Sequence, residues 1–149
     1  MIVDALLAWL HFMLVFGLCG CLLAELFFYG RELSRSTLRR LQRVDIAFGA
    51  LAAAVVVSGV VRVIFSPKGA AFFLHNPIFW TKMGLFGALG LLSIAPTLHY
   101  IALGRTAAGE ANIRVGDGAF KANRNYLFAE VILLLLIPCC AAFMARGFH

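Results

Sequence analysis

Four apolar segments, each long enough to cross a bilayer as a helix, constrain the fold of this chain more than any other feature. They run from Ile2 to Phe28, from Ile46 to Phe65, from Ile78 to Leu103 and from Tyr126 to Met144. A hydrocarbon core of ~30 Å needs roughly 20 helical residues to span it. None of the segments alternates apolar and polar residues as a membrane β-strand does. The sequence therefore predicts an all-α, integral membrane four-helix bundle, formed by a single transmembrane domain over residues 1–149.

The composition supports a membrane protein and excludes other classes. Apolar residues make up 62% of the chain, charged residues make up 13%, and the mean hydropathy is +0.93. Soluble domains have about 45–50% apolar and 25% charged residues. The net charge of +6 comes mostly from basic residues in loops beside the apolar segments. No nucleic-acid-binding motif accompanies them, so we expect the bilayer, not nucleic acid, as the partner.

The distribution of basic residues between loops predicts the topology. The first loop carries Arg31, Arg35, Arg39, Arg40 and Arg43, and the third carries Arg105, Arg114, Lys121 and Arg124. The second loop has only Lys68. Cytoplasmic loops are enriched in Lys and Arg. We therefore expect a multi-pass membrane protein whose first and third loops are cytoplasmic and whose N and C termini are both outside.

Three basic side chains belong to the outer half of this predicted bundle. His11 lies roughly 11–13 Å into the first segment at 1.5 Å per residue, too deep to reach water. It needs a partner, which can be a haem iron, another metal or a hydrogen bond. Arg62 and Lys82 lie near the outer ends of the next two segments. They either extend to the membrane surface or pair with carboxylates of a ligand, such as tetrapyrrole propionates, and one pocket can use all three residues.

A second polar group is expected on the cytoplasmic side. It contains Glu25, His99 and Glu130. The phenols at a similar depth are Tyr29, Tyr100 and Tyr126. Such groups serve as a proton relay or a second ligand site, or they merely contact lipid headgroups. Because His11 and His99 differ in depth by roughly 10–15 Å, two sites, or one haem without a second histidine ligand, fit better than one haem held by both.

Short motifs in a fixed order along the helices carry a family resemblance. They are Trp9-Leu10-His11, Arg39-Arg40-Leu41, Ser58-Gly59, Trp80-Thr81-Lys82, Leu98-His99-Tyr100 and Phe128-Ala129-Glu130. With these motifs the chain resembles a bacterial family of predicted membrane proteins of unknown function. It also distantly resembles the HemJ-type protoporphyrinogen oxidases, which are small helical membrane proteins reported to bind haem b.

The HemJ-type resemblance implies a haem and a set of site residues. His11 matches the family's suspected haem ligand, and Lys82 matches a lysine regarded as essential. His99 and Glu130 match further polar positions. Together with Arg62, which is expected there from its position and charge, the candidate cofactor-binding residues are His11, His99, Arg62 and Lys82, with His11 and His99 as candidate ligands of haem iron. The candidate catalytic residues are Lys82 and Glu130. The chain departs from the family at Leu98 and Ala129, where His and Asn are usual.

The leading hypothesis is a haem b-binding redox protein of the inner membrane. Its enzymatic form would be a protoporphyrinogen-oxidase-like tetrapyrrole oxidoreductase, and its simpler form an electron-transfer protein that passes electrons to a quinone. One alternative is a small proton- or metal-coupled transporter, and a homo-oligomer could form its pore. The other is a non-catalytic membrane assembly partner. No soluble catalytic motif such as a P-loop or HExxH occurs in the sequence.

Overall fold

Long α-helices dominate the computed structural model, which describes residues 2–66, 69–106 and 110–146. The long helices are α1 (Ile2–Phe28), α2 (Arg35–Ile64), α4 (Pro77–Thr106) and α5 (Asp117–Ala145). The short elements are α3 (Ala70–Leu74), β1 (Glu32–Ser34) and β2 (Asn112–Arg114). The 4 long helices are long and apolar enough to cross a membrane. The predicted all-α membrane bundle is therefore confirmed.

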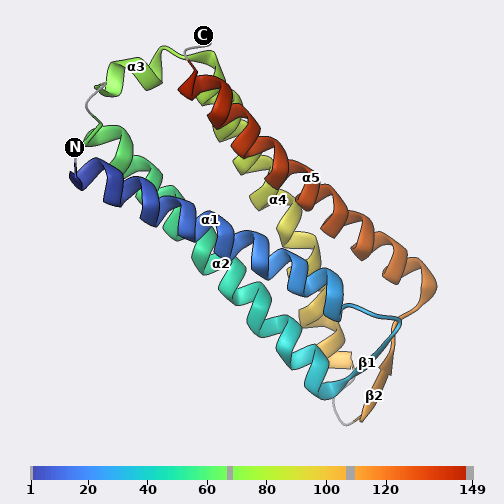
Figure 1. Ribbon diagram of the computed structural model, residues 1–149. Helices are drawn as coiled ribbons and strands as arrows, with labels where there is room; N and C mark the ends of the chain where they lie inside the picture. Colours follow the sequence, from blue (N-terminus) through green and yellow to red (C-terminus); the bar gives the residue numbers. More distant parts are fainter. Residues whose placement is uncertain (1, 67–68, 107–109, 147–149) are drawn as a thin grey trace.

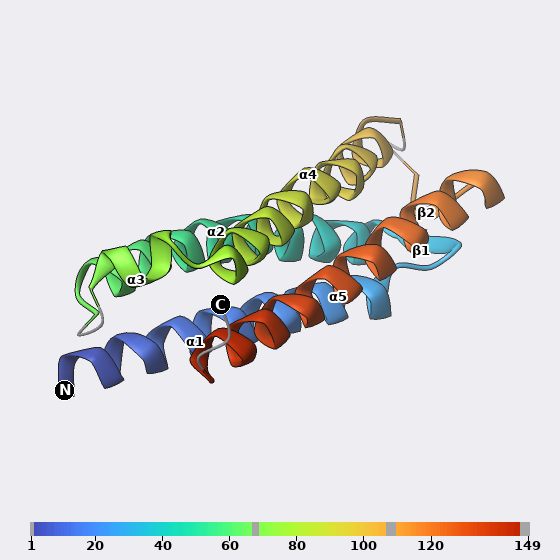
Figure 2. The same cartoon turned by 90° about the horizontal axis from the view of Figure 1, so that it is seen from above.

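The four helices form two hairpins (Figures 1 and 2). α1 packs along α2, α4 packs along α5, and the contacts between the hairpins, α1 with α5 and α2 with α4, are fewer. The hairpins diverge toward the end of the bundle where both chain termini lie (Figure 1). We call this the terminal end, and the opposite end, which carries β1 and β2, the sheet end. The termini share one end as predicted; the side of the membrane that they face stays a prediction.

The sheet end contains structure that the apolar pattern did not reveal. β1 and β2 pair antiparallel, with Leu33 opposite Ile113. The Oγ of Ser34 accepts a hydrogen bond of 3.1 Å from the backbone N of Thr37 and so caps α2. α2 consequently begins at Arg35 instead of Ile46, and α5 begins at Asp117 instead of Tyr126. Apolar segments indicate only the part of a helix inside the membrane, whereas polar helical turns extend beyond it.

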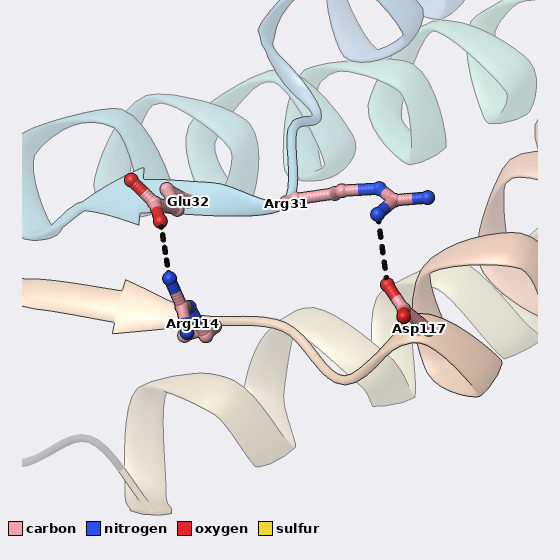
Figure 3. Close-up of polar contacts among 4 residues, drawn as sticks. All are labelled: Arg31, Glu32, Arg114 and Asp117. Atoms are coloured by element: carbon pink, nitrogen blue, oxygen red, sulfur yellow. Dashed lines mark hydrogen bonds and ion pairs between the residues drawn. The ribbon is translucent and has the colours of Figure 1, made fainter.

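Two ion pairs join the segments around the small sheet (Figure 3). Arg31 Nη1 lies 3.1 Å from Asp117 Oδ1, and Arg114 Nη2 lies 3.0 Å from Glu32 Oε1. All four side chains are well exposed to solvent. Solvent and salt therefore screen both pairs, and each contributes little to stability.

We expect Arg114→Ala to lower the free energy of unfolding by less than about 1 kcal/mol, the usual upper range for an exposed ion pair. Denaturant unfolding of the detergent-solubilised protein measures the change. Arg40→Ala, which removes an exposed arginine without an ion pair among the described residues, is the control. A loss of several kcal/mol in Arg114→Ala alone would contradict this account of the sheet end.

Side chains between the helices form a narrow core, and the outward faces are apolar. The core includes Leu18, Leu41, Tyr100 and Leu127, each fully buried. In contrast, Phe27 is 92% exposed. Many other large apolar side chains are exposed along all four long helices. Soluble monomers rarely expose such contiguous apolar surface, so lipid is the environment that this surface fits.

Candidate functional site

His11 is held in one orientation by a hydrogen-bonded chain from α2. Its Nδ1 lies 2.8 Å from Ser58 Oγ, and Ser58 Oγ donates a hydrogen bond of 3.0 Å to the carbonyl oxygen of Val55. Because the hydroxyl proton of Ser58 points to Val55, its oxygen is left to accept a proton from His11 Nδ1. The lone pair of the imidazole then resides on Nε2. No other hydrogen bond to the His11 ring occurs in the described residues.

Two cations lie near this histidine. Arg62 and Lys82 are both close enough to act electrostatically on His11 and on each other. The guanidinium of Arg62 lies 5.9 Å from the centre of the Phe12 ring, and Lys82 Nζ lies 5.3 Å from that of Phe79. We call His11, Arg62 and Lys82 the His11 site.

The cations of the His11 site have no acidic partner in the described part of the chain. Both ion pairs found there lie at the sheet end. The buried Nε of Arg62 has no hydrogen-bond acceptor among the residues that the structure describes. Burying charge without a partner is costly in an apolar environment. The arrangement therefore favours an anionic ligand at this site.

The structure brings together the three residues expected in the outer half but separates them from His99. His11 is on α1, Arg62 on α2 and Lys82 on α4, all toward the terminal end. His99 lies near the end of α4, on the sheet side of the bundle. That any of these residues binds a cofactor stays a prediction. His75 is exposed, and its Nδ1 lies 2.9 Å from the carbonyl oxygen of Ala71.

Three carboxyl groups gather nearer the sheet end. Glu25 of α1 and Glu130 of α5 are each only 2% exposed. Both interact electrostatically with Asp45 of α2, and Glu25 also interacts with Glu130. We call these three residues the acid cluster. Neither glutamate forms an ion pair with a cation among the described residues.

Hydrogen bonds to the acid cluster are incomplete. Tyr100 donates its hydroxyl proton to Glu25 Oε2 at 3.2 Å, and Thr97 donates to Asp45 Oδ1 at 2.8 Å. The buried Oε1 of Glu130 has no hydrogen-bond partner within residues 2–66, 69–106 and 110–146. The side-chain amide of Asn123, which is near Tyr100 and 3% exposed, lacks a partner of standard geometry. Buried polar atoms without partners are rare in folded proteins, so this cluster has unused capacity to bind a proton, water or another polar group.

His99 is hydrogen-bonded to Tyr29, which follows α1. Tyr29 Oη lies 2.8 Å from His99 Nε2. Burial raises the pKa of Tyr29 to about 12, so its phenol keeps its proton at neutral pH and can donate to Nε2. The Tyr29 ring also stacks on Phe120, with ring centres 5.4 Å apart. His99 Nε2 is thus occupied, unlike Nε2 of His11.

Replacing Tyr29 with phenylalanine removes this hydrogen bond but keeps the stacked ring. We expect the free energy of unfolding to fall by about 1–3 kcal/mol, because His99 Nε2 loses its partner. Denaturant unfolding in detergent measures the loss. Tyr126→Phe, at an exposed tyrosine, is the matched control. Equal stability of the two variants would argue against the Tyr29–His99 hydrogen bond.

Sequence patterns missed several partners in these sites. The sequence did not predict a role in these sites for Ser58, Asp45 or Thr97. The motif Ser58-Gly59 contributed only to the family resemblance. They come from α2 and α4, and only the relative rotation of the helices brings them to face His11 and Glu25. Tyr126, in contrast, was expected near the cytoplasmic group and is 43% exposed.

The described residues contain no group of three or more His, Cys, Asp or Glu side chains placed to hold a metal ion. A bare-ion site built from such ligands therefore finds no support in this part of the chain. Haem differs in this respect, because its porphyrin supplies four ligands and the protein supplies one or two. A single oriented histidine is enough for that role.

Comparison with known proteins gives one match. No curated protein and no solved structure matches the chain. The family model described as "Predicted membrane protein (DUF2214)" matches residues 3–149. The sequence had indicated a family of predicted membrane proteins of unknown function, and this is confirmed; the distant HemJ-type resemblance stays a prediction. Because the match covers nearly the whole chain, the protein belongs to the DUF2214 family of predicted membrane proteins.

Proposed function

We propose that this protein is a haem b-binding redox protein of the bacterial cytoplasmic membrane, in which His11 would bind the iron. One observation carries the proposal. Ser58 binds Nδ1 of His11 and leaves the lone pair on Nε2. Histidines that ligate metals typically donate their other ring N–H to a neighbouring group in this way, which fixes the tautomer and the ring orientation.

The charges around His11 support the same ligand. Haem carries two propionate carboxylates, and Arg62 and Lys82 are two cations without acidic partners among the described residues. Arginine binds carboxylates through two parallel hydrogen bonds, and the buried Nε of Arg62 is free to form one of them.

In this proposal the residues of the chain orient the cofactor and set its surroundings. Haem, when bound, supplies one-electron transfer. His11 would bind the iron, Arg62 and Lys82 would bind the propionates, and the apolar helix faces would exclude water. A membrane-dissolved quinone is the electron partner that the location favours.

A protoporphyrinogen-oxidase-like reaction is the enzymatic version of the proposal. Lys82 would then hold the carboxylates of the tetrapyrrole substrate. Glu130, the other expected catalytic residue, belongs to the acid cluster and not to the His11 site. Glu130 would therefore not contact the substrate carboxylates that Lys82 holds. Its role would be to release or take up a proton at the acid cluster.

Absorption spectroscopy tests the proposal. The protein is expressed with added haem precursor, purified in mild detergent, and measured oxidised and after reduction with dithionite. We expect a Soret band and sharpened α and β bands on reduction, with about one haem per chain. A colourless preparation from a well-folded protein would overturn the proposal.

A proton-conducting role is the second candidate, and the acid cluster favours it. A buried carboxyl without a cationic partner takes up a proton more readily than it stays charged. Glu25 and Glu130 are buried and come from α1 and α5, so they can exchange a proton between the two hairpins. Proton uptake into proteoliposomes under an imposed potential tests this role. Flux lost in Glu130→Gln but kept in Asp4→Asn would support it, and flux absent from the unmodified protein would exclude it.

A further inference from the structure

A cavity of ≈ 390 Å³ lies at the sheet end, between the beginning of α2 and the end of α4. Its lining residues are Arg35, Leu38, Arg39, Gln42, Ile101, Gly104, Arg105 and Ile113. Small-molecule sites typically occupy about 300–1,000 Å³. The cavity is thus large enough for a ligand, and neither the His11 site nor the acid cluster includes any of its residues.

Three arginines are among the residues that line this cavity. Arg35 and Arg39 are four residues apart, so they project from one face of α2, and Arg105 comes from the last turn of α4. Their side chains form no ion pair among the described residues, where Glu32 and Asp117 are paired with other arginines. Three positive charges lining one cavity without an ion-pair partner attract an anion. Guanidinium groups suit phosphate in particular, because their N–H groups match two of its oxygens.

The remaining wall of the cavity depends on a glycine. Gln42 Nε2 donates a hydrogen bond of 3.0 Å to the carbonyl oxygen of Tyr100. A Cβ atom at Gly104 would lie 2.7 Å from that same nitrogen. Glycine at this position therefore lets Gln42 lie against α4 and line the cavity.

The position of the cavity along α2 shows which anions can reach it. The apolar stretch of α2 begins at Ile46, and Arg39 lies roughly 10 Å before it at 1.5 Å per residue. Lipid headgroups extend roughly 5–8 Å beyond the hydrocarbon on each side. The arginines are therefore at the boundary of headgroups and water, where a lipid phosphate and a dissolved phosphate are both accessible.

We propose that Arg35, Arg39 and Arg105 form a site for a phosphate group, carried either by an anionic phospholipid or by a soluble phosphate compound. This site is independent of the haem proposal, because it shares no residue with the His11 site. It gives the basic residues of both predicted cytoplasmic loops one common ligand.

The test compares two triple variants with equal loss of charge. The first is Arg35→Gln, Arg39→Gln and Arg105→Gln. The second, the control, is Arg40→Gln, Arg43→Gln and Lys121→Gln, whose exposed residues lie at the same end but outside the cavity. Native mass spectrometry in detergent measures binding of phosphatidylglycerol, and calorimetric titration measures binding of inorganic pyrophosphate.

We expect the cavity variant to bind at least one of the two probes at least tenfold more weakly than the unmodified protein, while the control variant binds as the unmodified protein does. Loss in the phosphatidylglycerol arm assigns a lipid, and loss in the pyrophosphate arm assigns a soluble compound. Equal loss in both triple variants, or no binding of either probe by the unmodified protein, would overturn the proposal. If the cavity variant fails to fold, Arg105→Gln against Arg40→Gln decides the same question.

Discussion

Replacing His11 with alanine should remove haem from the purified protein. Without the imidazole the iron has no axial ligand from the His11 site, and we expect the haem content to fall at least tenfold. Ser58→Ala should have a smaller effect, because partners that orient a metal ligand usually change metal affinity by about 10–100-fold. The haem-to-protein ratio, determined from the reduced spectrum, measures both changes.

His75→Ala is the control for these variants, because His75 is exposed, lies outside the long helices, and has its Nδ1 2.9 Å from the carbonyl oxygen of Ala71. Its spectrum should equal that of the unmodified protein. Size-exclusion elution at the same volume establishes that each variant is folded. An unchanged haem content in His11→Ala would mean that another group ligates the iron.

The second large effect is expected at Tyr100, the fully buried tyrosine that is hydrogen-bonded to the acid cluster. Its ring is 0% exposed, its hydroxyl donates to Glu25, and its carbonyl oxygen accepts from Gln42. Tyr100→Ala leaves a cavity, and large aromatic residues replaced in this way cost about 3–5 kcal/mol. We expect a loss of this size in the free energy of unfolding, measured by denaturant unfolding in detergent.

Tyr100→Phe separates the hydroxyl from the ring. It keeps the packing but leaves Glu25 Oε2 without its donor, so we expect a loss of about 1–3 kcal/mol. Phe86→Leu is a control for a change of size at a partly buried position that packs against the core. If Tyr100→Ala were as stable as Tyr100→Phe, the ring would not be the packing element that the structure indicates.

The membrane architecture could be predicted from the sequence because it depends on one dominant effect. A helix must be long and apolar to cross the bilayer core, and segments such as Ile2–Phe28 are both. The first turns of α2 and α5 could not be located in this way. Their residues are polar, lie outside the apolar stretches, and are held by local features such as the Ser34 cap.

The candidate sites were predictable only in part, for a related reason. An ionisable residue inside an apolar helix stands out, so His11, Arg62 and Glu130 could be identified singly, and depth along each helix grouped them. The positions of ionisable residues along each helix do not show how one helix is rotated relative to another. The pairing of His11 with Ser58, and of Asp45 with Thr97, depends on that rotation and needed the structure.

Pulsed electron paramagnetic resonance of the oxidised protein tests the central claim most directly. The protein is labelled with isotopically substituted histidine, and the coupling of the iron to a bound histidine nitrogen is recorded. We predict this coupling in the unmodified protein and in His99→Ala and His75→Ala, and its loss in His11→Ala. Coupling that persists without His11 and disappears without His99 would contradict the account, and so would a protein that binds no haem.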